Sequence, residues 1–207
     1  PMSGKFITFE GIEGSGKSTQ IRLLTAALDE RGIPYILTRE PGGPPISERI
    51  RQLLLDPENS EMLPETELLL YSASRAQHTG EVIIPALRSG KHVICDRYYD
   101  SSYAYQGAAR QLDKEWIRVL TAFCTFRTDP DLTVLLDMDV EAGQARIRDR
   151  KLDRLELESL EFHKKVRQQY LSIAKENTSR YFVLNGADEK KDLHASILNA
   201  VLKLIGE

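Results

Sequence analysis

Short apolar segments recur along the chain, and longer segments with a different pattern lie between them. The apolar segments are Phe6–Phe9, Tyr35–Thr38, His92–Cys95, Leu132–Leu136 and Tyr181–Leu184. They are predominantly apolar and do not alternate apolar with polar residues, which is typical of strands covered on both faces in a parallel sheet. We therefore predict five strands at these positions.

The segments between the predicted strands have the periodicity of helices. Two sets of apolar residues have helical spacing: Phe162, Val166, Tyr170 and Ile173, and Leu193, Ile197, Val201 and Leu204. The alternation of strands and helices predicts an α/β fold, with a five-stranded, mainly parallel sheet flanked by helices on both faces. No repeat, low-complexity stretch or linker interrupts the chain, so we expect residues 1–207 to form a single domain.

Composition and charge narrow the class of protein. The chain has 207 residues, of which 41% are hydrophobic and 29% charged, and its formal net charge is −3. A general nucleic-acid binder is expected to be basic, so an anionic ligand must be held by a local site. Cys95 and Cys124 lack metal-ligand spacing, and no apolar run approaches the ~20 residues that span a bilayer. We expect a cytoplasmic enzyme that binds neither nucleic acid nor membranes.

A glycine-rich stretch after the first predicted strand matches the phosphate-binding pattern G-x-x-x-x-G-K-S. Glycines let backbone N–H groups converge on phosphates, and the start of the following helix adds partial positive charge. The lysine of the pattern reaches the β- and γ-phosphates, and its serine can bind Mg²⁺. We expect a nucleotide polyphosphate at Gly11, Ile12, Glu13, Gly14, Ser15, Gly16, Lys17, Ser18 and Thr19.

Several classes of protein use such a loop. A GTPase would need an Asn/Thr-Lys-x-Asp base reader, and neither Phe126–Asp129 nor Glu189–Asp192 fits. Motor and remodelling ATPases usually have longer chains. A small phosphotransferase fits better, and it needs cations for the acceptor, a pocket for the acceptor's body and a lid that excludes water. A nucleotide sensor without turnover remains an alternative.

Arginines follow two of the predicted strands. Arg39 comes after the second strand, and Asp96 and Arg97 come after the third. In an open α/β sheet, ligands gather at the carboxyl ends of the strands, and an arginine fork binds phosphate bidentately. Asp96 is placed to hold the water shell of Mg²⁺. The alternative, that these are surface ion pairs contributing about 0–1 kcal/mol each, is weaker because both doublets end apolar strands.

Two further stretches suit a base and a sugar. Asp100–Arg110 combines aromatic rings, hydroxyls and an amide, although an ordinary helix start with core tyrosines would have the same composition. Tyr71 and Arg75 lie one helical turn apart, so both can face one pocket.

Taken together, these motifs resemble those of bacterial thymidylate kinases, and the match runs nearly end to end. The motifs are EGIEGSGKST, TREPGG, the Tyr71–Arg75 helix, DRYYDSSYAYQG and a flap that ends LDRLELES. The resemblance implies a P-loop kinase fold that transfers the γ-phosphate of ATP to dTMP with Mg²⁺, giving ADP and dTDP for dTTP biosynthesis, usually as a homodimer. A kinase for another nucleoside monophosphate is the alternative.

The resemblance also assigns an acceptor site. It implies that Arg75 hydrogen-bonds the thymine edge and that Tyr71 stacks on the base, where relatives more often have phenylalanine. Tyr105 would crowd the sugar where a ribonucleotide has its 2′-hydroxyl. The other implied dTMP contacts are Arg39 and Arg97 at the phosphate and Ser102 and Gln106 beside the base.

The same resemblance explains an acid in the phosphate loop, since Glu13 would reach the 3′-hydroxyl of the acceptor's deoxyribose. Relatives with this acid carry an arginine-rich lid. Here the charged segment Arg146–Glu158, which has almost no apolar face, is predicted to be a mobile flap within a lid of about residues 142–158. We expect Arg146 to contact ATP and Arg150 to bridge the two sets of phosphates, a role that raises rates by ~10³–10⁵. The predicted catalytic residues are Lys17, Arg97 and Arg150.

Overall fold

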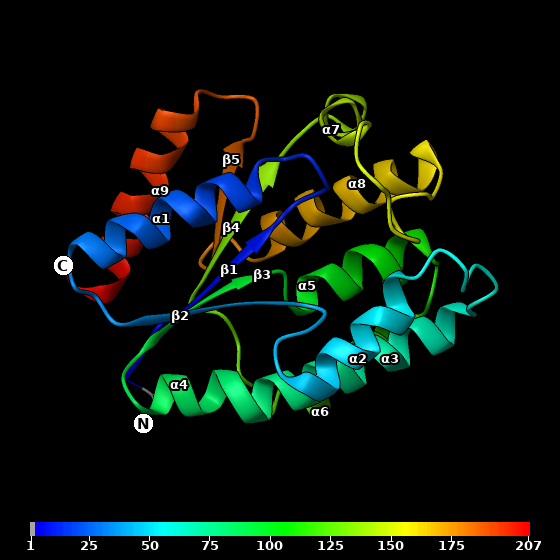
Figure 1. Cartoon of the computed structure of the whole chain (residues 1–207), viewed down its shortest axis with the longest axis horizontal. Coiled ribbons are helices and arrows are strands. Elements are labelled where there is room, and N and C mark those ends of the chain that lie inside the picture. The colour runs from blue at the N-terminus through cyan, green and yellow to red at the C-terminus, as the bar shows by residue number, and fades with distance from the viewer. Residues whose placement is uncertain (1–2) are drawn as a thin grey trace.

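The computed structural model describes residues 3–207, and these residues form a five-stranded sheet in which all neighbouring strands are parallel (Figure 1). Its strands are β1 (Phe6–Glu10), β2 (Tyr35–Arg39), β3 (His92–Asp96), β4 (Leu132–Asp137) and β5 (Tyr181–Asn185), in the order β2-β3-β1-β4-β5. The fold class predicted from the sequence is confirmed.

Each strand is longer than its prediction by one residue, and that residue is polar in every case: Glu10, Arg39, Asp96, Asp137 and Asn185. The apolar pattern ends one residue early, and the pairing of backbones between strands continues through the polar residue. In register, Asp96 of β3 lies beside Arg39 of β2 and beside Phe9 of β1. The carboxyl edge of the sheet is therefore a row of polar residues.

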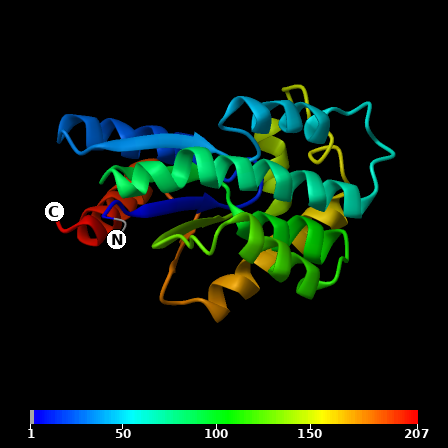
Figure 2. The same ribbon diagram turned by 90° about the horizontal axis from the view of Figure 1, so that it is seen from below.

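Helices occupy the connections between strands. They are α1 (Lys17–Glu30), α2 (Pro45–Leu55), α3 (Pro64–His78), the π-helical turn η1 (Thr79–Ile83), α4 (Ile84–Arg88), α5 (Tyr99–Ser102), the π-helical turn η2 (Tyr103–Ala109), α6 (Lys114–Cys124), α7 (Val140–Ile147), α8 (Leu160–Glu176) and α9 (Lys190–Ile205). The run from α3 through η1 to α4 crosses much of the length of the molecule (Figure 1, Figure 2). Pro64 starts this run, where proline's missing N–H is not needed.

The two faces of the sheet are covered by different helices. Helices α1 and α9 pack together on one face, over Ile7, Phe9 and Ile94. Phe6 and Val93 point to the opposite face, which α4 and its neighbours cover. These strand residues have no exposed surface, as a sheet buried on both faces requires.

The predicted flap has two different parts. Its first part belongs to α7, whose N-terminus is capped by the Asp139 side chain. Residues 148–158, called the lid segment below, form neither helix nor strand. Arg154 and Leu155 of this segment are buried, which differs from the exposed, charged segment expected from the sequence. Within residues 3–207, no helix combines the length and hydropathy needed to cross a membrane.

Candidate active site

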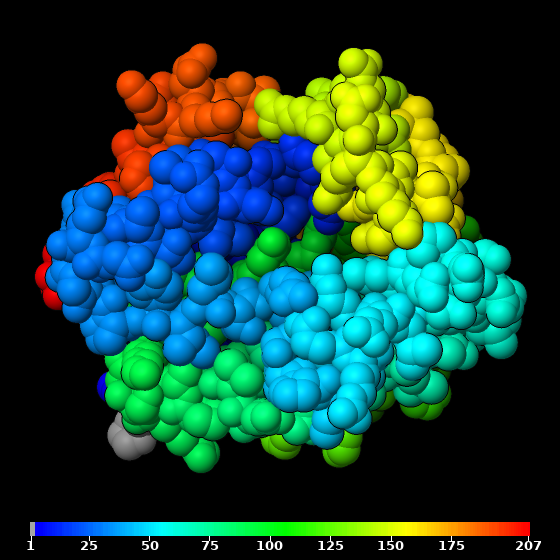
Figure 3. Space-filling model, viewed as in Figure 1, coloured from blue at the N-terminus to red at the C-terminus, as the bar shows by residue number. Residues whose placement is uncertain are grey.

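Two of the cavities at the carboxyl edge of the sheet share residues of the phosphate loop. One, the loop cavity, has a volume of about 860 Å³ and lies along Glu13–Gln20 and the start of α1. The other, the side-chain cavity, has a volume of about 370 Å³ and is enclosed by side chains from many elements. Glu13, Ser18 and Arg150 line both cavities. The surface is hollowed here, between the dark blue phosphate loop, the yellow lid segment and cyan α2 (Figure 3).

The phosphate loop has a backbone that only glycine can provide. Gly14 has φ +77°, and a Cβ there would lie 2.2 Å from the carbonyl oxygen of Gly143 in α7. Lys17 is buried and donates from Nζ to the carbonyls of Gly11 at 3.1 Å and Ile12 at 3.2 Å. Burial lowers the pKa of Lys17, and the nearby Arg97 lowers it further.

The loop cavity also contains groups that suit an anionic ligand. The hydroxyl of Ser15 is buried and has no hydrogen-bond partner. Ser18 and Thr19, at the start of α1, line the cavity with it. Backbone N–H groups at such a helix start carry partial positive charge. Gly11 and Ile12, at the start of the phosphate loop, do not line this cavity, but their carbonyls accept from Lys17 and orient it.

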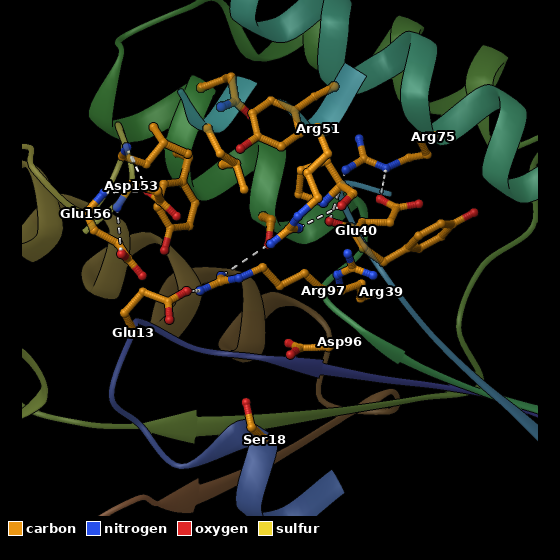
Figure 4. A pocket seen from close by; sticks show the side chains of 18 of the residues that line it. Glu13, Ser18, Arg39, Glu40, Arg51, Arg75, Asp96, Arg97, Asp153 and Glu156 are labelled. Carbon is orange, nitrogen blue, oxygen red and sulfur yellow. Dashed lines mark hydrogen bonds and ion pairs between the residues drawn. The ribbon is translucent and has the colours of Figure 1, made fainter. Parts of the chain in front are cut away.

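Glu13 stands between the cavities and faces guanidiniums. Its carboxylate lies 2.6 Å from Nη2 of Arg97 and 3.3 Å from Nη2 of Arg150 (Figure 4). Partial burial raises the pKa of Glu13, but the positive charges of Lys17, Arg97 and Arg150 outweigh that effect and hold the pKa well below its ordinary value. Glu13 therefore stays ionised at neutral pH.

Arg97 follows β3 with an unusual backbone. Its φ is +71°, in the left-handed region that non-glycine residues rarely adopt, and its N–H donates to the carbonyl of Phe9 at 2.9 Å. The guanidinium is 3.0 Å from the hydroxyl of Tyr170 and lies over the ring of Tyr105, 5.3 Å from its centroid. These contacts hold the Arg97 guanidinium beside Glu13, where the two cavities meet.

A buried carboxylate supports Arg97 from behind. Glu10 has no exposed surface and accepts hydrogen bonds from the backbone N–H of Tyr98 at 2.8 Å and from the hydroxyls of Ser101 and Tyr170 at 2.7 Å each. Burial and the nearby Asp100 raise the pKa of Glu10 to about 7. Sequence reasoning missed Glu10 and Tyr170. The polar residue directly after the apolar FITF was the available signal for Glu10.

Arg75 lies deep in the side-chain cavity. It is 2% exposed, and its guanidinium donates to Glu40 at 2.7 Å, to the Ser102 hydroxyl at 2.9 Å and to the carbonyl of Tyr98 at 3.2 Å. Tyr71, one turn earlier on α3, lines the same cavity, and burial raises its pKa. Ser102 does not line the cavity and stands behind Arg75.

Other predicted residues also reach the side-chain cavity. They are Arg39, Asp96, Tyr105 and Gln106. Arg39 is half-exposed and pairs with Glu48 at 3.0 Å. Sequence reasoning missed Arg51 of α2, which lines the cavity and donates to the carbonyl of Pro41 at 2.7 Å.

Ser18 and Asp96 could hold a cation together. Oδ1 of Asp96 is buried without a hydrogen-bond partner, and Ser18 lies opposite it across the cavity floor (Figure 4). Within residues 3–207, no cluster of three or more His, Cys, Asp or Glu has the arrangement of a metal site. One carboxylate and one hydroxyl suit Mg²⁺, which proteins bind through few side chains plus water and substrate phosphates.

The lid arginines differ in where they point. Arg146 donates to the carbonyl of Gly14 at 3.0 Å, and Arg150 contacts Glu13 and Glu156. Arg148 is 76% exposed and pairs only loosely with Asp149. Two of the three arginines thus reach the phosphate loop. The loop after β5 was missed from the sequence: Gly186 lines the loop cavity, and a Cβ there would lie 2.8 Å from the carbonyl oxygen of Ser15.

A parallel sheet with a phosphate loop after β1 and two cavities that meet at that loop defines a P-loop nucleoside monophosphate kinase. The chain belongs to the thymidylate kinase family, whose model matches residues 9–197. It is 47% identical to a thymidylate kinase of Pelobacter propionicus over 97% of this chain and 94% of the relative. It is 48% identical to that of Trichlorobacter lovleyi (95% and 96%) and 49% identical to that of Carboxydothermus hydrogenoformans (93% and 94%).

Proposed function

We propose that this chain transfers the γ-phosphoryl group of ATP to dTMP, giving ADP and dTDP. The observation that carries the proposal is the meeting of the two cavities at Glu13, Ser18 and Arg150. A nucleotide in each cavity would bring its phosphates to that junction. Phosphoryl transfer needs the two nucleotides held in line and their negative charge balanced, and little else from the protein.

On the donor side, the phosphate loop would surround the ATP phosphates with backbone N–H groups. Lys17 would leave the carbonyls of Gly11 and Ile12, which it contacts at 3.1 and 3.2 Å, and reach the β- and γ-phosphates. Arg146 lies against Gly14 at the tip of the loop and would contact ATP from the lid side. Arg150 is the group we assign to the bridging position, because it already lies beside Glu13.

On the acceptor side, arginine forks would hold dTMP. Arg97 and Arg39 would bind its phosphate, and Arg75 the edge of thymine, with Tyr71 stacked on the ring. Ser102 would act through Arg75, whose guanidinium donates to it at 2.9 Å. The other assigned contacts are Gln106 at the base, Tyr105 at the sugar and Glu13 at the 3′-hydroxyl.

We assign Mg²⁺ to Ser18 and Asp96. The buried and unpartnered oxygen of Asp96 supports this assignment, since such an atom is costly unless a cation or its water shell pairs with it. When held by Ser18 and Asp96, Mg²⁺ would supply positive charge that offsets the negative charge developing on the transferring phosphoryl group. Ser18 would orient those phosphates through its place at the start of α1.

The test is ADP release measured with a panel of acceptors. We expect turnover with dTMP to exceed that with dCMP, dGMP and UMP by at least roughly 10²-fold, because unpaired polar groups in the base site penalise the wrong base. Preference for another monophosphate would support the alternative of a different nucleoside monophosphate kinase. No stimulation by any of them would contradict kinase function altogether and leave a nucleotide sensor.

We further propose that the chain works as a homodimer through α6. Trp116, Val119 and Phe123 lie on one face of that helix, and their exposed fractions are 66%, 42% and 79%. A contiguous apolar face of this kind marks an interaction surface. In light scattering, Phe123→Glu is expected to halve the molar mass, whereas Val183→Glu on the edge strand β5 should not. A wild-type chain that is already monomeric would contradict this proposal.

We also propose that the chain works in the cytoplasm. Cys95 and Cys124 are both free and buried. Unpaired cysteines are typical of compartments where thiols stay reduced, and such a compartment also supplies ATP.

A further inference from the structure

Another buried carboxylate lies beyond the side-chain cavity, outside the residues assigned above. Glu67 of α3 has no exposed surface. It accepts from the amide of Gln106 at 2.7 Å and from Arg110 at 3.1 Å. It also forms an ion pair with Nη2 of Arg154 at 2.6 Å, a contact of opposite charges that lacks hydrogen-bond alignment. Burial opposes its ionisation, but the hydrogen bonds from Arg110 and Gln106 and the charges around it lower its pKa. The Glu67 carboxylate therefore connects three parts of the chain: α3, η2 and the lid segment.

Arg154 ties the lid segment to the body of the molecule. Its backbone N–H donates to the carbonyl of Leu55 at 3.1 Å, and its Nε donates to the carbonyl of Leu54 at 2.7 Å. Arg110 adds a second tie, 2.5 Å from Glu158. Arg154 is 6% exposed, although it stands in the most charged stretch of the chain. The C-terminal part of the lid segment, called its inner end, is therefore held against the body of the molecule. The N-terminal part is called its outer end.

The outer end of the lid segment carries Arg150, which is about half-exposed. Arg154 stands in a compact turn, Asp153–Glu156: the Asp153 side chain accepts from the N–H groups of Leu155 and Glu156 at 2.9 Å each, and the Glu156 side chain accepts from the N–H of Asp153 at 2.9 Å. Glu156 also contacts Arg150. This turn and the Glu156 side chain therefore connect Arg154 to Arg150.

Glu67 also lies on the face of α3 that forms the base site. Glu67, Tyr71 and Arg75 follow at intervals of four residues, so they form one stripe along the helix. Gln106, whose amide nitrogen Glu67 engages, lines the side-chain cavity. The residue that holds the lid segment thus also orients a group beside the proposed thymine position.

We propose that Glu67 is a positioning residue, which through Arg154 and Gln106 sets the distance between Arg150 and the base site. It contacts neither nucleotide. This inference rests on the proposed kinase function, because Arg150 and Gln106 have their assigned roles only there. The competing view is that Glu67 and its partners are only a structural ion-pair cluster, and the experiment separates the two.

The test compares Arg154→Met, Arg154→Lys and Glu67→Gln with a matched control, Arg118→Met, which removes one partner of the exposed Glu115–Arg118 pair on α6. Arg154→Met leaves Glu67 with Arg110 and Gln106, so the fold is expected to persist. Arg154→Lys keeps the charge but removes the fork, and it serves if the methionine variant does not fold. Hydrogen exchange of residues 148–158 without nucleotide and steady-state kinetics are the readouts.

We expect Arg154→Met to speed exchange of residues 148–158 by at least about tenfold, because a local opening loses its tie. Turnover is expected to fall on the order of tenfold or more through misplacement of Arg150, with the KM for ATP within about twofold. Glu67→Gln is expected to lower kcat in the same way and also to raise the KM for dTMP, since an uncharged amide oxygen holds the Gln106 amide less firmly than the carboxylate does. Arg154→Met should leave that KM unchanged.

Unchanged exchange of residues 148–158 in Arg154→Met would overturn the inference. So would a loss of kcat no larger than that of Arg118→Met, or a fall in kcat that only follows the fraction of unfolded protein. If wild type phosphorylates no monophosphate, the proposed function fails, while the exchange measurement still decides whether Arg154 holds the lid segment.

Discussion

The two cavities are built in different ways. The loop cavity is shaped mainly by one continuous stretch, Glu13–Gln20, whose glycines let backbone groups face the ligand. The side-chain cavity is lined by residues of β2, α2, α3, β3, α5, η2 and the lid segment, and many of these residues have charged or hydroxyl side chains. A site made of backbone is positioned by its own turn. A site made of side chains needs buried partners to hold each group.

Three arginines of the side-chain cavity each have a carboxylate partner. Glu40 holds Arg75 at 2.7 Å, Glu13 faces Arg97 at 2.6 Å, and Glu48 pairs with Arg39 at 3.0 Å. The cavity is therefore rich in positive charge but already neutralised in part. An incoming phosphate must compete with a carboxylate, which favours a doubly charged monophosphate ester over weaker anions.

The largest effect is expected from removing one arginine side chain from the side-chain cavity. Arg97→Ala is expected to lower kcat by about 10³-fold or more, because an arginine at transferring phosphates has effects of that size. ATP affinity, measured by calorimetry, should stay within a few-fold, since the loop cavity is intact. Arg88→Ala, at an exposed position on α4, is the control. Turnover like that of wild type in Arg97→Ala would remove the acceptor-phosphate site.

The next test concerns the residue that both cavities share. Glu13→Gln removes the charge that faces Arg97 and Arg150 but keeps the size of the side chain. We expect kcat/KM for dTMP to fall roughly 10–100-fold through a lost charge-assisted hydrogen bond, and the KM for ATP to change little. Initial rates with each substrate varied in turn measure both constants. A large loss of ATP affinity instead would assign Glu13 to the donor.

The buried Glu10, behind the side-chain cavity, is expected to make the stability of the fold depend on pH. Its folded pKa is about 7, above the ordinary 4.5, so between pH 5 and 7 the folded chain keeps a proton that the unfolded chain releases. Its contribution to stability is therefore greatest at low pH and is lost as pH rises through 7. Relative to wild type, Glu10→Gln should gain on the order of 1–3 kcal/mol in unfolding free energy between pH 5 and 8.

Urea unfolding at several pH values measures this difference for Glu10. Asp100→Asn serves as the comparison, because the charge of Asp100 contributes to raising the pKa of Glu10. A difference between wild type and Glu10→Gln that does not change with pH would contradict the assignment.

The smallest effect is expected on the loop side. Arg146 is exposed and contacts only the carbonyl of Gly14 there, at 3.0 Å. Arg146→Ala should raise the KM for ATP about three- to tenfold, since exposed charge contacts are individually weak, and leave the KM for dTMP unchanged. Arg148→Ala, which points to solvent, is the matched control. Equal effects in both variants would show a general loss of lid charge instead of a specific contact.

The sequence predicted the loop cavity better than the side-chain cavity for a physical reason. Glycines and a lysine at fixed spacing determine the phosphate loop locally, so Lys17 and Ser18 could be named from the pattern. Apolar periodicity located every strand but stopped before its last residue, and so it passed over Glu10. No local pattern indicates that a charged residue will be buried.

The residues that sequence reasoning missed share this property. Glu67 and Arg154 are more than 80 positions apart, and both are buried among partners, including each other, that only the folded chain brings together. Arg154 therefore looked like part of a solvated flap. Gly186 was passed over because its close approach to Ser15 exists only in the folded sheet.

The left-handed backbone of Arg97 has a consequence beyond chemistry. A side chain in that region costs about 1–2 kcal/mol relative to the ordinary helix region, and glycine is free of that cost. Two inactive proteins, one with alanine and one with glycine at position 97, should thus differ in melting temperature although both lack the guanidinium. The difference in melting temperature measures the backbone strain at position 97 independently of any contact between Arg97 and a nucleotide.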